Sequence, residues 1–115
     1  MMHYYKIKNV DRIVDGDTID VTIDLGFSLY HKTRIRLAGI NTPETRTRDL
    51  EEKAAGIEAK DFLIDRIINA DEITLQTEKQ GKFGRYLGIV YADGIDLNQT
   101  LLEEGHATKY DGGKR

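Results

Sequence analysis

Alternation of apolar and polar residues dominates the first third of the chain. From residue 18 to residue 24, every second residue is isoleucine or valine and the others are threonine or aspartate. This two-residue period is typical of a strand with one buried face. Residues 4–14 also have the composition of a strand and end at Asp15-Gly16, a favourable hairpin turn, while Gly26 ends the second strand. Residues 30–40 form a third strand, so we expect an antiparallel meander.

The pattern changes to a helical period after residue 49. Apolar residues then recur every three or four positions and form one stripe: Leu50, Ala54, Ile57, Leu63, Ile64, Ile67 and Ile68. Asp49, with Glu52 three residues later, resembles a capping box and predicts a helix start. Because Gly56 costs roughly 1 kcal/mol relative to alanine inside a helix, we expect the regular helix to begin near Ile57.

Two more strands and a short helix complete the predicted fold. Residues 73–78 and 86–91 have strand composition, and the Asp93-Gly94 turn follows the second of them. Residues 97–104 predict a short helix that ends at Gly105, a typical C-terminal cap. The order β-β-β-α-β-β-α is that of a five-stranded Greek-key barrel of the OB type. We therefore expect one mainly β, α+β domain over residues 1–115.

Composition excludes several classes of chemistry. The chain has no cysteine, which excludes disulfides, thiolate nucleophiles and cysteine-type zinc sites. No apolar stretch approaches the ~20 residues that span a bilayer, and the N-terminus lacks the apolar core of a signal peptide. We expect no membrane association; localisation stays open, and is cytoplasmic if the chain is complete. The histidines at 3, 31 and 106 are too scattered to predict a site.

The net charge of −3 hides an uneven distribution. Residues 31–48 contain five lysines and arginines against the single acid Glu44, and residues 79–86 contain three bases without an acid. Residues 49–72, in contrast, carry eight acids and three bases. A basic region of this kind suits a phosphate-bearing partner, although chance clustering on a solvated surface is the plainer interpretation.

Two of the candidate motifs lie on the predicted meander. Asp15-Gly16-Asp17-Thr18 offers two carboxylates around a glycine, which are hard oxygen ligands for Ca²⁺ or Mg²⁺; the alternative is an ordinary hairpin turn. Arg36 alternates with Ile35 and Leu37, so a rigid strand directs it to one side. A guanidinium held in this way suits a phosphate, whereas a surface ion pair is the common fate of strand arginines.

Two further motifs lie in loops. Pro43 is the only proline of the chain and restrains the backbone of Asn41-Thr42-Pro43-Glu44, so that Glu44 could orient or deprotonate a water molecule. In Gly81-Lys82-Phe83-Gly84-Arg85, the glycines allow the backbone to approach a ligand and Lys82 and Arg85 supply charge. The alternatives are a surface glutamate after a strand and a flexible basic turn.

The order of these motifs along the chain resembles the staphylococcal nuclease (thermonuclease) family. The resemblance runs from about Val10 to Ala107. It includes Gly56-Ile57-Glu58-Ala59 in the predicted helix, Tyr91-Ala92-Asp93-Gly94 after the last strand, and Asn98. It implies an OB barrel and a Ca²⁺-dependent endonuclease that acts on single-stranded DNA and RNA, cleaves the bond from phosphorus to the 5′ oxygen and leaves 3′-phosphates.

The resemblance also implies roles for individual residues. Asp17 and Asn41 would be side-chain ligands of the Ca²⁺ ion, and Thr42 would contribute its backbone carbonyl. Glu44 would be the general base, with the charge on the phosphate stabilised by two arginines, Arg36 and Arg85. Asp15 is then a turn or outer-sphere residue. Nucleic-acid contacts would come from Lys82, Phe83, Arg46, Arg48 and Tyr110.

Three departures from the family pattern modify these expectations. Asn41 stands where an aspartate is common, so we expect weaker metal binding or a changed ion preference. Phe83 replaces a tyrosine and keeps a ring that can stack on a base but cannot donate to a phosphate. The chain ends at Arg115, before the third, C-terminal helix of the family, so we expect two helices.

Two other functions remain open from the sequence. The same barrel could bind nucleic acid with weak or no cleavage, as degenerate copies of the family do, or serve only as a protein-interaction module. Degenerate copies tend to lose the glutamate or the arginines, whereas Arg36, Glu44 and Arg85 are all present. We therefore favour a nuclease, and we expect it to be a monomer.

Overall fold

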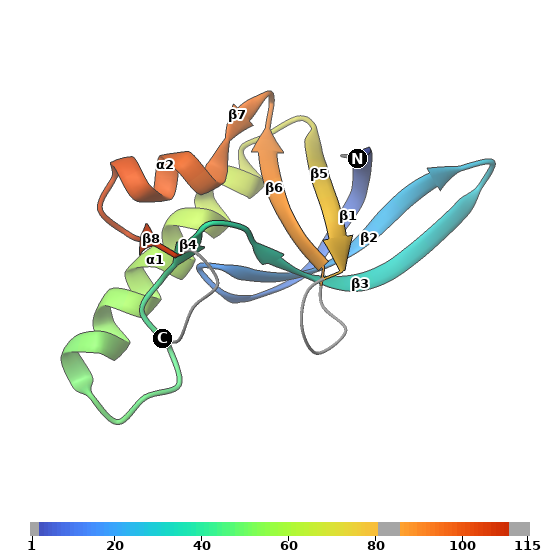
Figure 1. Cartoon of the computed structure of the whole chain (residues 1–115). Coiled ribbons are helices and arrows are strands. Elements are labelled where there is room, and N and C mark those ends of the chain that lie inside the picture. Colours follow the sequence, from blue (N-terminus) through green and yellow to red (C-terminus); the bar gives the residue numbers. More distant parts are fainter. Residues whose placement is uncertain (1–2, 81–85, 111–115) are drawn as a thin grey trace.

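A five-stranded barrel forms the centre of the molecule (Figure 1). The computed structural model describes residues 3–80 and 86–110, including their side chains except those of residues 78–80. Its long strands are β1 (His3–Asp15), β2 (Thr18–Gly26), β3 (Leu29–Leu37), β5 (Ile73–Gln80) and β6 (Tyr86–Ala92). Three short strands accompany them: β4 (Ile40–Asn41), β7 (Ile95–Asp96) and β8 (Thr108–Lys109).

Neighbouring barrel strands follow the order β3-β2-β1-β5-β6, and these pairs are all antiparallel. A short parallel pairing between β3 and β6, from Ile35↔Tyr86 to Leu37↔Gly88, closes the barrel. This is the OB topology that the sequence predicts. The third strand is shorter than expected, because a turn at Ala38-Gly39 separates β3 from β4.

The predicted alternation defines the barrel interior. Ile19, Val21 and Ile23 on β2 are buried, as are Ile35 and Leu37 on β3. The other strands complete the core with Ile7, Leu75, Val90 and Ala92. Because apolar burial is the main stabilising contribution to folding, this shared interior fixes the register of the strands that carry the candidate site.

The long helix α1 (Leu50–Ile68) begins earlier than predicted. Asp49 caps it by accepting hydrogen bonds from the backbone N–H groups of Glu51 and Glu52. The expected start near Ile57 is wrong, because Gly56 lies inside the helix and permits a close contact. A Cβ atom at Gly56 would lie 2.6 Å from the carbonyl oxygen of Glu44. The glycine therefore serves helix packing at the expense of helix propensity.

The second helix, α2 (Leu97–Glu103), packs against β6. Asp96 caps it by accepting a hydrogen bond from the N–H of Gln99. The chain then turns at Gly105, whose φ of 78° is the left-handed conformation expected after a helix end. α1 and α2 are the two helices of the described residues, in agreement with the prediction.

Among the residues that the structure describes, no helix combines the length and the apolar character needed to cross a bilayer.

Candidate functional site

Arg36 lies at the centre of a buried polar cluster. Arg36 is only 8% exposed, because β6 pairs with the end of β3 that carries it. One guanidinium nitrogen, Nη1, lies 3.4 Å from Oδ2 of Asp17 and donates to the carbonyl of Leu37 at 3.3 Å. The other, Nη2, donates to Oδ1 of Asn41. The barrel thus holds a planar cation in one orientation.

Asp17 is fixed just as tightly in the turn between β1 and β2. The residue is 4% exposed. Oδ2 accepts a hydrogen bond from the Thr42 backbone N–H at 3.0 Å, and Oδ1 accepts one from the Thr18 hydroxyl at 3.0 Å. These donors and Arg36 compensate for the desolvation that a buried carboxylate suffers.

Gly16 allows this turn to pack beneath α1. A Cβ atom at Gly16 would lie 2.9 Å from Cβ of Ala59 and 3.0 Å from Cγ2 of Thr42. Any larger residue would push the turn away from the helix or from the 42–49 segment. The glycine in the Asp-Gly-Asp sequence is therefore required by close packing here, beyond its general use in hairpin turns.

The oxygens of Asp17 and Asn41 converge on one cationic group, the Arg36 guanidinium. A carboxylate, an amide oxygen and the neighbouring Thr42 carbonyl are the hard donors that Ca²⁺ prefers. The donor set therefore fits such an ion, although it contains a single carboxylate. Within the described residues, no three His, Cys, Asp or Glu side chains gather as a metal-binding group.

Glu44 lies two residues beyond Thr42 and is exposed. Its backbone is held from the helix side: its N–H donates to Oε2 of Glu52 at 3.2 Å, and its carbonyl packs against Gly56. Glu52 therefore does not complete the predicted capping box. It holds the loop of the candidate base instead.

Asp15 holds the same loop from the barrel side. Its Oδ1 accepts hydrogen bonds from the Thr45 hydroxyl at 2.6 Å and from the Thr45 N–H at 3.4 Å. Asp15 thus contacts Thr45, whereas Asp17 contacts Arg36 and Thr42. The two carboxylates of the Asp-Gly-Asp motif have different partners.

Tyr110 reaches the cluster from the C-terminal side. The Arg36 guanidinium carbon lies 5.4 Å from the centroid of the Tyr110 ring, which is within the range of a cation–π contact. The Tyr110 N–H donates to the carbonyl of Gly39 at 2.9 Å, and β8 pairs with β4 next to it. These bonds join a segment about seventy residues away in the chain to Arg36 and Asn41.

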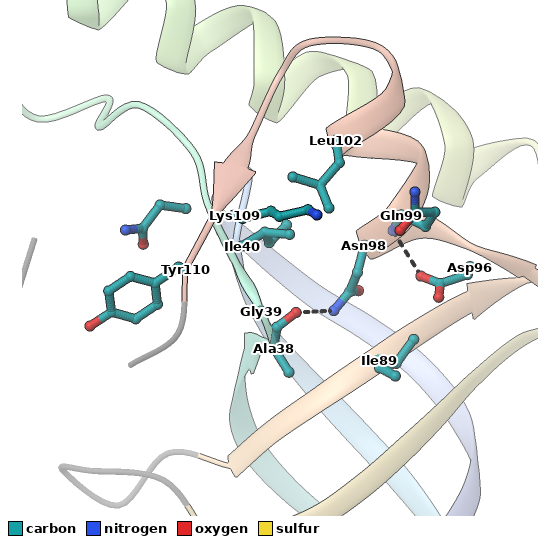
Figure 2. Close-up of a pocket in the computed structure, with 11 residues that line it drawn as sticks. Ala38, Gly39, Ile40, Ile89, Asp96, Asn98, Gln99, Leu102, Lys109 and Tyr110 are labelled. Atoms are coloured by element: carbon teal, nitrogen blue, oxygen red, sulfur yellow. Dashed lines mark hydrogen bonds between the residues drawn. The ribbon is translucent and has the colours of Figure 1, made fainter. Parts of the chain in front are cut away.

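An open pocket of about 740 Å³ lies next to Tyr110 and Asn41 (Figure 2). Asn98 points into its wall from α2 and donates to the carbonyls of Ala38 and Gly88 at 2.9 and 3.0 Å. Its Oδ1 accepts from the Val90 N–H at 3.2 Å. Asn98 thus joins α2 to the turn after β3 and to the middle of β6. Only the match to the family motif singled it out in the sequence.

The other residues predicted to contact nucleic acid or phosphate lie on the exposed surface or outside the described residues. Arg46 and Arg48 are exposed in the segment between Thr42 and α1. The other three, Lys82, Phe83 and Arg85, lie outside the described residues. The structure describes β6 from Tyr86 onward, and Tyr86 pairs with Ile35.

Arg34 provides a contrast two residues before Arg36. Its side chain is 45% exposed and forms an ion pair with Asp20, with Nε 2.7 Å from Oδ1. The hydrogen bonds from Arg34 lower the pKa of the Asp20 carboxyl below its ordinary value of 3.8. Arg34 has the usual fate of a strand arginine, whereas the Arg36 side chain is 9% exposed and contacts the side-chain oxygens of Asp17 and Asn41.

Comparison with known proteins identifies the family of the chain. The chain is 35% identical over 101 residues to the SPbeta prophage-derived endonuclease YokF of Bacillus subtilis (strain 168), covering 85% of this chain and 32% of that protein. It is 34% identical over 100 residues to the thermonuclease of Staphylococcus hyicus, covering 85% of this chain and 56% of that protein. The chain thus spans about half of these relatives or less. Residues 34–114 match the family described as staphylococcal nuclease homologue, and the chain therefore belongs to the staphylococcal nuclease family.

Proposed function

We propose that this domain hydrolyses phosphodiester bonds of single-stranded DNA and RNA by attack of water. The bond from phosphorus to the 5′ oxygen would break, leaving a 3′-phosphate. The observation that carries the proposal is the buried Arg36, held between Asp17 and Asn41 at the positions of the family motifs. Relatives named endonuclease and thermonuclease support a nuclease activity.

Arg36 would stabilise the negative charge that grows on the phosphate oxygens. A guanidinium offers several donors in one plane, which matches two oxygens of a phosphate. Because Arg36 is buried, its field is less screened than that of an exposed arginine such as Arg34. Arg85 would act on the same charge.

Glu44 would act as the general base. It would take a proton from water while the water oxygen forms a bond to phosphorus and the 5′ oxygen leaves with the bonding electron pair. A base needs a fixed backbone and access to water. The contacts of Glu52 and Gly56 with the Glu44 backbone meet the first requirement, and its exposure meets the second.

We propose Ca²⁺ as the cofactor, held by the side chains of Asp17 and Asn41 and by the Thr42 carbonyl. When bound, a hard divalent ion polarises a phosphoryl oxygen and holds water near the base. The same two side chains contact Arg36 in this structure, so Arg36 and the ion would share them. The neutral Asn41 brings no charge, which should weaken the affinity for Ca²⁺.

The test compares cleavage of a labelled single-stranded DNA oligonucleotide in millimolar Ca²⁺ with cleavage in EDTA. Glu44→Gln keeps the size of the side chain and removes its basicity, and Glu103→Gln on the exposed face of α2 is the control. We expect EDTA to abolish cleavage and Glu44→Gln to reduce the rate by ~10²–10³. Treatment of the products with a 3′-phosphatase should shift them on a gel.

Two outcomes would contradict the proposal. Cleavage that survives EDTA or the Glu44 substitution would exclude the proposed mechanism. Binding of the oligonucleotide without cleavage by the wild type would identify a nucleic-acid-binding module instead.

A further inference from the structure

The hairpin of β2 and β3 projects from the barrel (Figure 1). The residues at its tip are apolar and exposed. Phe27, in the turn, is 99% exposed, more than any other large hydrophobic residue of the described chain. Leu25, Leu29 and Tyr30 beside it are 48%, 60% and 47% exposed. Four large apolar residues therefore face solvent at one end of a two-stranded ribbon.

The turn itself is unfavourable for these residues. Phe27 and Ser28 have φ values of 55° and 62°, the left-handed region. Two-residue hairpin turns of this kind favour Asn-Gly, because a bulky side chain is strained at positive φ. Phe27 combines this strain with nearly complete exposure, so it contributes little to folding. Strained and exposed residues of this kind are typical of functional sites.

The tip and the candidate active site share one face of β3. Pairing with β2 is regular from Asp24↔Tyr30 to Thr18↔Arg36, so the side chains of residues 30, 32, 34 and 36 leave the strand on the same side. Six residues at ~3.3 Å each separate Tyr30 from Arg36 by about 20 Å. A nucleic acid bound at Arg36 can therefore extend along this face toward the tip.

Cations lie beside Tyr30, one of the two aromatic residues of the tip. The Lys8 ammonium lies 4.3 Å from the centroid of the Tyr30 ring and donates to its hydroxyl at 3.2 Å. Lys32 is exposed at the next position of the same face. The acids nearby already accept hydrogen bonds: Asp24 from the Gly26 N–H, Asp20 from Arg34, and Asp11 from Thr22 and Asn9.

We propose that this tip is a second contact for single-stranded nucleic acid, with bases stacked on Phe27 and Tyr30 and phosphates next to Lys8 and Lys32. Aromatic rings beside cations form the usual stacking platform for single strands. At ~3.4 Å per stacked nucleotide, about six nucleotides span the distance from Arg36 to Tyr30. The inference rests on the proposed function only in taking nucleic acid as the ligand.

The experiment measures binding of fluorescent 3-nucleotide and 12-nucleotide single-stranded DNA in EDTA by fluorescence anisotropy. The variant Phe27→Ser/Tyr30→Ser removes both rings. Tyr4→Ser is the matched control, because Tyr4 is an aromatic residue with 69% exposure outside the tip. We expect the double variant to lose about tenfold in affinity for the 12-mer and to bind the 3-mer like the wild type. Phe27→Trp should retain the affinity, because stacking needs only a ring.

Equal 12-mer affinity of the double variant and the wild type would overturn the inference. A wild-type dimer that the double variant converts to a monomer would also overturn it, because the tip would then be a dimer contact. A variant that loses only its binding to anionic phosphatidylglycerol vesicles would overturn it as well, because the tip would then bind lipid. Failure of the proposed function has a different result: a wild type that binds the 12-mer through the tip and cleaves nothing would leave this contact intact.

Discussion

The two ends of the β2–β3 ribbon differ in how far their side chains are buried. At the barrel end, Thr18 and Arg36 pair across the strands, and both are less than 9% exposed. At the tip, Phe27 is 99% exposed and makes no contribution to the core. Packing and chemistry act together on the first end, so each substitution there should affect both stability and activity. At the tip, a substitution should be able to change nucleic-acid binding without lowering stability.

Arg34 and Arg36 illustrate the same difference within one strand. They leave the same face of β3, two residues apart. Within the residues that the structure describes, β6 pairs with β3 from Ile35 to Leu37, so the closure lies beside Arg36, whereas the Arg34 side chain is 45% exposed. Position relative to the barrel closure, and not residue type, therefore separates the candidate phosphate ligand from the surface ion pair.

The largest expected effect comes from Arg36→Lys. The charge is retained, but a single ammonium cannot contact Asp17 and Asn41 in the fork geometry of the guanidinium. We expect kcat/KM to fall by ~10²–10³, measured with a labelled oligonucleotide. Arg34→Lys, in the exposed ion pair, is the control and should change the rate less than about twofold. A similar loss of kcat/KM in both variants would show that the buried arginine is no more important for catalysis than the exposed one.

Gly56→Ala tests the packing that holds the Glu44 loop. The new methyl group would meet the Glu44 carbonyl at 2.6 Å, so the loop must move. We expect kcat to fall by about tenfold or more, because small displacements of a catalytic group are costly. Ala54→Gly, on the exposed face of α1, should lower the free energy of unfolding by ~1 kcal/mol without changing kcat. An active, more stable Gly56→Ala protein would contradict the role of this contact.

Asn41→Asp tests the metal proposal. A second carboxylate beside Asp17 should lower the Ca²⁺ concentration needed for half-maximal activity by about tenfold. Isothermal titration of Ca²⁺ without nucleic acid gives an independent measurement of the same affinity. An unchanged calcium requirement in both assays would show that residue 41 does not set the affinity.

At the tip, Phe27→Asn with Ser28→Gly should stabilise the protein. The introduced asparagine and glycine both tolerate the positive φ of this turn, and replacing the exposed Phe27 loses little buried surface. We expect the free energy of unfolding to rise by about 1 kcal/mol, measured by urea denaturation, while cleavage of a trinucleotide stays unchanged. A decrease in stability would indicate that Phe27 supports the fold.

The smallest effect concerns pH. The hydrogen bonds from Arg34 lower the pKa of Asp20 in the folded state. The pair therefore stabilises the protein above the ordinary pKa of 3.8, and this stabilisation is lost as pH falls through the lower folded value. Since the pair is partly exposed, we expect Asp20→Asn to cost only ~0.5 kcal/mol at pH 7. The difference from wild type should shrink in urea denaturation at acidic pH.

The sequence by itself determined much of the fold because its signals are local. The two-residue alternation predicted the meander, and Asp49 and Gly105 marked helix ends, since periodicity and capping involve residues close together in the chain. The order of the motifs indicated the family and selected Asp17, Arg36 and Glu44. Their assigned roles stay predictions until the variants are measured.

Only the tertiary structure decided which of these residues meet. Arg36, Asp17 and Tyr110 are far apart in the chain, and β-sheet pairing and barrel closure bring them into contact. Gly56 suggested a late helix start in the sequence, yet in three dimensions it lets the helix approach the Glu44 carbonyl closely. Phe27 falls between two predicted strands and no pattern singled it out, whereas the structure places it at the exposed tip of the projecting ribbon. Such features depend on distances between separate segments, which local patterns do not contain.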